Sequence, residues 1–181
     1  MTDRLKRTND ELKADRPTID EIKLINKAPI YIMLENIRSV HNVGSIFRTA
    51  DGFGVSKIFL TGYTACPPRD DLSKTALGAD KVVSWEHFDN PLDAIEILKR
   101  DNIHPIAIEQ TINSKCIFDC EFDFPSCFIL GNEVNGISED VLDCVSNHVE
   151  ITMKGIKQSF NVSVAAGIVC SEMTRQNLLL S

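Results

Sequence analysis

Three segments of the chain place glycines and polar side chains directly after a predicted strand, at residues 36–50, 128–138 and 151–169. In an open α/β sheet, ligands bind at the carboxyl ends of the strands. We therefore expect the chemistry of this protein to lie where these three segments meet.

The first segment carries cationic and amide side chains between a strand and a helix. The pattern predicts a helix that opens near Asn42 as its cap, which places Arg48 less than two turns inside it. An arginine side chain is long enough to reach an anion at the preceding loop, where Arg38 and His41 are candidate contacts for a phosphate or a ribose. The alternative is structural: Asn42 caps the helix and Arg48 makes a surface ion pair.

The second segment runs from a buried strand into Gly131 and a turn that contains Glu133 and Gly136. Glycines permit positive φ and a close approach of backbone to a ligand. Ser138 with the two acids that follow it is also an ordinary helix start, and Glu133 in a turn is either functional or merely solvated.

The third segment leaves a strand at Met153 and crosses a loop with Lys154 and Lys157. It then enters a helix through Ser159 and Asn161. The first turns of that helix are small and apolar, which favours close packing against another backbone. A capped core helix is the alternative, and it leaves the Ser-Phe-Asn triplet unexplained.

The elements that must position these segments alternate between strand and helix, which is typical of an α/β fold with a mostly parallel sheet and helices on both faces. Strands are predicted at 30–34, 57–60, 81–85, 105–108, 126–130 and 148–153, and helices at 43–53, 73–77, 90–100, 138–145 and 162–179. We expect one domain at 29–181. Residues 1–28 form a polar arm of one or two short helices, capped at Asn9 or Thr18.

The composition is that of a folded globular protein, with 43% hydrophobic and 25% charged residues in 181. The net charge of −7 is concentrated in residues 82–150, which hold 3 basic and 14 acidic residues. The rest of the chain can present a neutral or basic face, so composition neither demands nor excludes an RNA partner.

The six cysteines show neither a C-x-x-C pair nor the spacing of a zinc site, so we expect reduced thiols and no metal. The charged N-terminus offers no apolar run for a signal peptide or a membrane span. A cytoplasmic protein without a membrane partner is the expectation.

Together, the three segments resemble the sequence motifs of the SpoU (TrmH-like) branch of the SPOUT superfamily of RNA methyltransferases. The resemblance rests on N-x-G-S-I-F-R-T-A at 42–50, L-G-N-E-x-x-G-I-S at 130–138 and I-x-M-x-G-x-x-x-S-F-N-V-S-V-A-A-G at 151–167. It implies a sheet whose C-terminal segment forms a deep trefoil knot, an exception to the rule that chains are unknotted. It also implies a homodimer that transfers a methyl group from S-adenosylmethionine to a ribose 2′-hydroxyl of tRNA or rRNA.

Carried onto this chain, the resemblance implies a cofactor pocket formed by Gly131, Ile151 and Phe160, with Met153, Ile108 and Glu109 as neighbours. Phe160 departs from the family, which usually has Leu there. The absence of G-x-G-x-x-G agrees with a knot pocket and disfavours the alternative of a nucleotide-binding oxidoreductase.

The same resemblance implies a catalytic set of Arg48, Asn42, Glu133, Ser159 and Asn161. Arginine as a literal general base conflicts with its pKa above ~12. We therefore expect Arg48 to grip the neighbouring phosphate and stabilise the developing alkoxide, while the proton passes to phosphate oxygen, water or Glu133.

RNA selection is expected from the dimer surface, the arm and the loop at 61–75, where Arg69 and Lys74 are candidate contacts, although its Pro-Pro pair also suits a rigid turn. A catalytically inactive, knotted RNA-binding factor is the alternative function. The complete catalytic set weighs against it.

Overall fold

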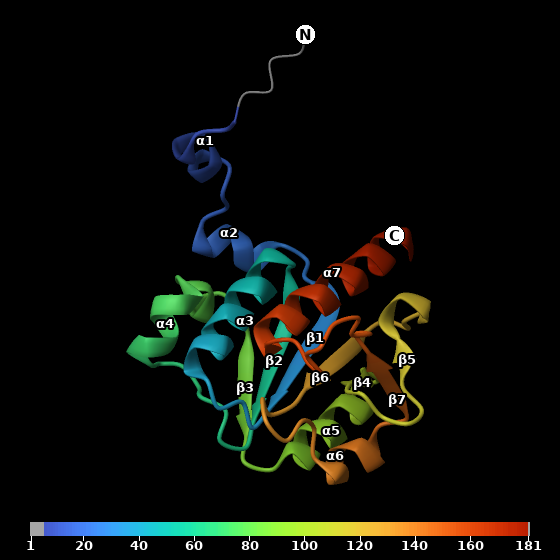
Figure 1. The fold of residues 1–181 in the computed structure, drawn as a ribbon. Coiled ribbons are helices and arrows are strands. Elements are labelled where there is room, and N and C mark those ends of the chain that lie inside the picture. Colours follow the sequence, from blue (N-terminus) through green and yellow to red (C-terminus); the bar gives the residue numbers. More distant parts are fainter. Residues whose placement is uncertain (1–5, 181) are drawn as a thin grey trace.

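The computed structural model describes residues 6–180 as a sheet covered by helices on both faces (Figure 1). The seven strands lie in the order β3-β2-β1-β6-β4-β7-β5, and all the pairs between them are parallel. Their bounds are β1 (Ala28–Glu35), β2 (Val55–Thr61), β3 (Trp85–Phe88), β4 (His104–Ile108), β5 (Lys115–Cys116), β6 (Ser126–Leu130) and β7 (Asn147–Glu150). The predicted α/β class with a mostly parallel sheet is confirmed.

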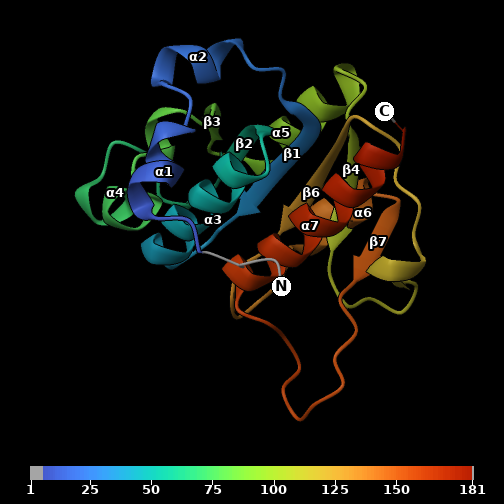
Figure 2. The ribbon, with the colours of Figure 1, turned by 90° about the horizontal axis from the view of Figure 1, so that it is seen from above.

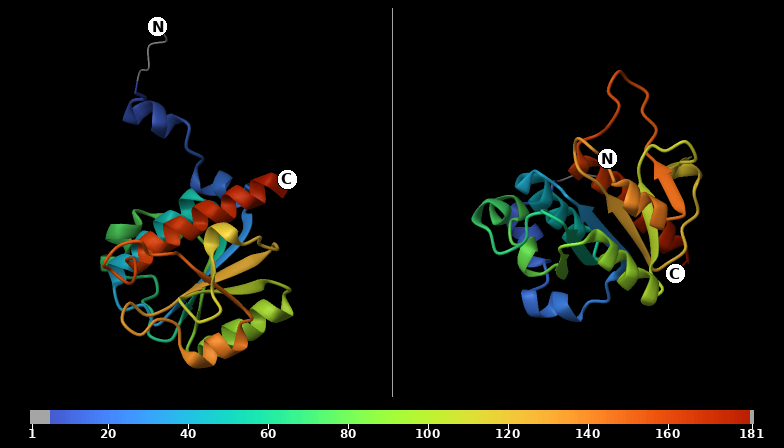
Figure 3. Two further views of the ribbon diagram at one scale, coloured as in Figure 1. Left: turned by 45° about the vertical axis from the view of Figure 1, so that its right-hand side comes forward. Right: turned by 90° about the horizontal axis from the view of Figure 1, so that it is seen from below.

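Two helices, α3 (Val40–Gly52) and α7 (Val162–Leu180), lie side by side on one face, and α5 (Pro91–Arg100) and α6 (Glu139–Cys144) lie on the other (Figures 1 and 3). The short helix α4 (Asp70–Ala76) and the 3-10 turn η1 (Ala79–Lys81) pack against α3, while the 3-10 turn η2 (Ile117–Asp119) contacts α7. The arm contains α1 (Asn9–Ala14) and α2 (Ile19–Leu24), which extend from the sheet domain (Figure 1).

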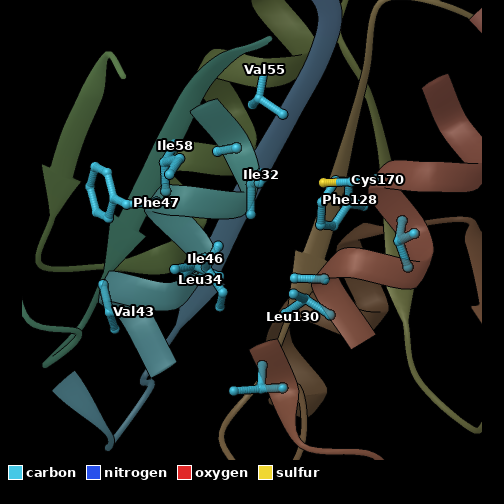
Figure 4. Packing of buried hydrophobic residues seen from close by; sticks show 14 of the residues in the cluster. Ile32, Leu34, Val43, Ile46, Phe47, Val55, Ile58, Phe128, Leu130 and Cys170 are labelled. Carbon is cyan, nitrogen blue, oxygen red and sulfur yellow. The ribbon is translucent and has the colours of Figure 1, made fainter. Parts of the chain in front are cut away.

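The core is divided by the alternation of side chains along the strands. In β1, Ile32 and Leu34 point to the α3 and α7 side, whereas Met33 points to the α5 and α6 side. Val43, Ile46 and Phe47 of α3 pack over the first of these layers, and Cys170 of α7 packs near Phe128 (Figure 4). Every residue of β6 is buried, as expected for the central strand of a sheet covered on both faces.

Several predicted boundaries are wrong for local physical reasons. The strand predicted at 81–85 is absent at 81–84. Gly78, with φ +94°, is the N-cap of η1, Val83 is buried in the cluster that includes α3 and α7, and β3 begins only at Trp85. The strand predicted to reach Met153 ends at Glu150. The two-residue strand β5 was missed because it is too short to show a periodicity.

The predicted helix caps are partly corrected. Ser39, not Asn42, caps α3: its hydroxyl oxygen accepts the Asn42 N–H at 3.3 Å, which leaves the Asn42 side chain for other partners. Thr8, rather than Asn9, caps α1 through a capping box with Glu11. The cap at Thr18 is confirmed, again with a capping box.

The six cysteines are free thiols. Burial raises the pKa of Cys170 to about 12 and that of Cys127 well above its usual range, so both are inert core groups at neutral pH. Among residues 6–180, no three His, Cys, Asp or Glu side chains are grouped to hold a metal ion. Within the same range, no helix has the length and apolar character needed to span a bilayer.

Candidate active site

A cavity of about 520 Å³ opens at the carboxyl ends of β4, β6 and β7. It is lined by all six residues predicted to bind the cofactor: Ile108, Glu109, Gly131, Ile151, Met153 and Phe160. These residues are up to 52 positions apart in the sequence, and the parallel sheet brings them to one edge. Ser159 and Glu133 of the predicted catalytic set line the same cavity.

The glycines of the second motif let one wall of the cavity fold tightly on itself. A Cβ at Gly131 would lie 2.2 Å from the Gly136 carbonyl carbon. Because this atom belongs to the backbone, it cannot move aside as a flexible side chain could, and only glycine fits at position 131. Gly136 has φ +70°, and a Cβ there would lie 2.3 Å from Oε2 of Glu109. That carboxylate oxygen accepts the Ile137 N–H at 3.1 Å, so Glu109 supports the turn from the end of β4.

The opposite wall is the segment between β7 and α7, which projects from the body of the protein as a long loop (Figure 2). Gln110 Nε2 donates to the Gln158 carbonyl oxygen at 2.6 Å and so joins this loop to the end of β4. The sequence offered no signal for Gln158, because a polar residue inside a polar loop looks solvated. Phe160 lines the cavity and is 42% exposed to solvent.

Three predicted catalytic residues form a hydrogen-bonded chain across the site. Glu133 Oε1 accepts Asn42 Nδ2 at 3.0 Å, and Asn42 Oδ1 accepts Asn161 Nδ2 at 3.1 Å. Asn161 Oδ1 in turn accepts the Ser163 N–H at 2.9 Å, at the start of α7. The chain therefore fixes the turn after β6, the first turn of α3 and the first turn of α7 relative to one another.

Glu133 also binds the backbone that enters α3. Its two carboxylate oxygens accept the N–H of Arg38 at 2.8 Å and of Ser39 at 3.0 Å. Partial burial raises the pKa of this carboxyl, but the hydrogen bonds from Arg38, Asn42 and Ser39 lower it, and the pKa lies below its ordinary value of 4.5. Glu133 is therefore an ionised acceptor of hydrogen bonds at neutral pH.

Arg48 is not among the residues that line the cavity. It lies on the exposed face of α3 and borders a separate hollow of about 550 Å³ with Ser45, Thr49, Lys74, Thr75 and Leu77. Within one chain, the structure thus brings together four of the five predicted catalytic residues and leaves the fifth outside.

The candidate RNA contacts lie in different surroundings. Arg38 and His41 are exposed at the start of α3, where the Arg38 N–H donates to Glu133. The Arg69 guanidinium donates two hydrogen bonds to the Asp71 carboxylate, from Nε to Oδ1 at 3.0 Å and from Nη2 to Oδ2 at 2.8 Å. This hydrogen bonding raises the pKa of Arg69. Lys74 borders the hollow next to Arg48. The use of these four residues by RNA remains a prediction.

Further supporting residues were missed by the sequence reasoning. Glu35, 1% exposed, accepts the Ser138 hydroxyl at 2.5 Å and the Ser138 N–H at 3.1 Å. Asn132 Nδ2 donates to the Asn36 carbonyl at 2.8 Å and to Tyr63 Oη at 2.6 Å. Glu35 could have been recognised in the sequence, because it is a carboxylate placed directly after the apolar run of β1.

The model of the SpoU rRNA Methylase family matches residues 29–171. The chain is 29% identical over 160 residues to a 23S rRNA (guanosine-2′-O-)-methyltransferase of Neisseria meningitidis, covering 88% of this chain and 64% of that protein. It is 28% identical over 166 residues to a tRNA (guanosine(18)-2′-O)-methyltransferase of Thermus thermophilus, and the match covers 92% of this chain and 84% of that protein. The solved structure of a TrmH/SpoU tRNA modifying enzyme of A. aeolicus is similar to this structure, with a TM-score of 0.80 and 25% sequence identity. The match covers 90% of this chain and 83% of that chain.

Proposed function

Because the chain belongs to the SpoU rRNA Methylase family, we propose that it is an S-adenosylmethionine-dependent RNA methyltransferase acting on a ribose 2′-hydroxyl of tRNA or rRNA. The observation that carries this proposal is the convergence of the predicted cofactor residues on one cavity, beside the chain Glu133, Asn42 and Asn161.

The cavity fits S-adenosylmethionine by volume and by chemistry. About 520 Å³ lies within the range of roughly 300–1,000 Å³ that small-molecule sites occupy. Ile108, Leu130 and Ile151 supply apolar walls for the adenine, and the carboxylates of Glu109 and Glu133 suit a ligand with cationic groups. When bound, this cofactor supplies an electrophilic methyl group on its sulfonium.

The chain's own residues then have to align the acceptor oxygen and stabilise its charge. Arg48 holds the phosphate next to the target ribose and stabilises the developing alkoxide, and Ser159 borders the place where the two reactants meet. Asn42, Glu133 and Asn161 act by holding α3 and α7 in place. The proton leaves to a phosphate oxygen or to water.

A homodimer is part of this proposal, because Arg48 and the cavity are apart within one chain and a second copy is needed to complete the site. The C-terminal helix supports it: Val164 is 50% exposed, and Leu178, Leu179 and Leu180 are 68–73% exposed. We expect light scattering to give twice the chain mass of 20.2 kDa. A single-chain mass across micromolar concentrations would rule out both the dimer and the shared site.

We further propose that residues 29–181 form one methyltransferase domain with a deep trefoil knot, preceded by the arm at 1–28, and that the protein works in the cytoplasm. The knot is proposed from the family to which the chain belongs. Gln176 joins α7 to the segment after η2, because its Nε2 donates to the Cys120 carbonyl at 2.8 Å and its Oε1 accepts the Phe122 N–H at 3.0 Å. Both η2 and α3 therefore contact α7.

Titration calorimetry with S-adenosylmethionine and S-adenosylhomocysteine, followed by tritiated methyl transfer into unmodified tRNA and rRNA, tests the function. We expect binding of both ligands and 2′-O-methyl incorporation into one RNA class. Absence of binding would overturn the cofactor site and the enzyme together. Binding without transfer to either RNA class would favour the inactive RNA-binding factor.

A further inference from the structure

The hollow beside Arg48 is formed by two helices that are far apart in the sequence. Ser45, Arg48 and Thr49 come from α3, whereas Lys74 and Thr75 come from the last turn of α4 and Leu77 follows as its left-handed cap. Figure 1 shows α4 beside α3, and the hollow holds about 550 Å³. None of its lining residues lines the cofactor cavity.

Gly44 allows the two helices to approach closely enough to build this hollow. A Cβ on Gly44 would lie 2.0 Å from Thr75 Oγ1 and 2.6 Å from the Leu72 carbonyl oxygen. The Thr75 hydroxyl is itself held, because it donates to the Leu72 carbonyl at 3.0 Å. Lys74 therefore extends from a helix end whose position against α3 is fixed by backbone contact.

The charges around the hollow are unbalanced. Its lining contains two cations and no carboxylate. Within residues 6–180, neither Arg48 nor Lys74 makes an ion pair. Among the acids close to these residues in the sequence, Asp71 binds Arg69 and Asp80 accepts the Ser73 hydroxyl at 2.7 Å. Asp51 of α3 and Asp70 of α4 are not among the residues that line the hollow. Two like charges sharing a concave surface repel each other, and an anion between them removes that repulsion.

We propose that this hollow binds one backbone phosphate of the RNA substrate, with Lys74 of α4 as a second cation beside Arg48. The inference rests on the proposed function and adds a residue for which the family motifs give no role. Arg48 offers a planar fork of donors, and Lys74 offers a point charge from the other side. The hydroxyls of Ser45 and Thr49 border the same space as further donors. Lys74 is thus a positioning residue for the RNA strand.

The test measures affinity for an unmodified tRNA transcript at several salt concentrations. The slope of log K against log[salt] is negative, and losing one phosphate contact makes it shallower by about 0.7 to 0.9. We therefore expect Lys74→Ala to show a slope shallower by that amount and to bind the transcript roughly three- to tenfold more weakly at physiological salt. Lys74→Arg should keep the wild-type slope. Lys99→Ala removes an exposed lysine from α5 on the other face of the sheet and should change neither quantity.

Calorimetry with S-adenosylmethionine on each variant shows that the fold is intact, because the cavity shares no residue with the hollow. A wild-type salt slope in Lys74→Ala would overturn the inference. A second result would also overturn it: Lys74→Ala no longer binds inorganic phosphate, but the salt dependence of its RNA binding is unchanged. The hollow would then be a site for free phosphate and not for the RNA backbone. Failure of the proposed function is a separate result: the wild type would bind the transcript but methylate neither tRNA nor rRNA.

Discussion

Arg48→Ala is expected to lower the rate of methyl transfer by about 10²- to 10³-fold, the loss typical of removing one donor that stabilises a developing oxyanion. The same variant should keep the wild-type Kd for S-adenosylmethionine, because Arg48 lies outside the cofactor cavity. Single-turnover transfer and calorimetry on the same preparation check the two halves of this prediction. A parallel loss of cofactor affinity would contradict the separation of the two sites.

Arg48→Lys tests whether a positive charge at this position supports methyl transfer. A lysine keeps the positive charge, and raised pH makes loss of the 2′-hydroxyl proton easier, so we expect measurable transfer to return as the pH rises. Arg100→Lys, the same exchange at an exposed arginine of α5, is the control and should keep the wild-type rate. If Arg48→Lys remained inactive at every pH while still binding cofactor, the proposed role of Arg48 would have to be abandoned.

Sequence patterns predicted the fold best where a strand is buried on both faces. The interior strands β1, β2 and β6 carry apolar runs at 30–34, 58–60 and 127–130, and their positions agree with the prediction to within a few residues. The prediction failed at residues 81–84, where Val82 and Val83 have the pattern of a strand but pack in the cluster that includes α3 and α7, after a turn at Gly78. The spacing of apolar residues indicates that a residue is buried, but it does not indicate which element of the fold packs against that residue.

The candidate site was predictable because its glycines and polar residues follow strand ends, and parallel strands end at one edge. Contacts between the motifs were not predictable. Asn42 was expected to cap a helix, yet Ser39 does so and frees the Asn42 amide to join Glu133 with Asn161. The position of Arg48 beside Lys74 depends on the close packing of α4 at Gly44, which no local pattern encodes.

The hydrogen bonds of Glu133 determine how its charge depends on pH. Because its pKa in the folded protein lies below 4.5, the carboxylate is fully ionised at neutral pH, and its stabilising contribution is lost only as the pH falls through that lowered pKa. An effective general base needs a pKa near the working pH. Glu133, with both oxygens already accepting N–H groups, is suited to hold α3 rather than to take the substrate proton.

Glu133→Gln should therefore lower the rate of methyl transfer by about 10- to 100-fold, because an amide loses charge-assisted hydrogen bonds and turns a donor toward Arg38 N or Ser39 N. The residual activity should keep the shape of the wild-type pH profile, since the group that takes the proton is still present. Glu139→Gln, an exposed acid in the first turn of α6, is the matched control and should remain fully active. Rates measured from pH 4 to 9, a range that reaches below the ordinary carboxyl pKa of 4.5, decide between the two roles. Disappearance of the acidic limb in Glu133→Gln alone would make Glu133 the proton acceptor, and the hydrogen-bonded chain to Asn42 and Asn161 would then serve to orient a base.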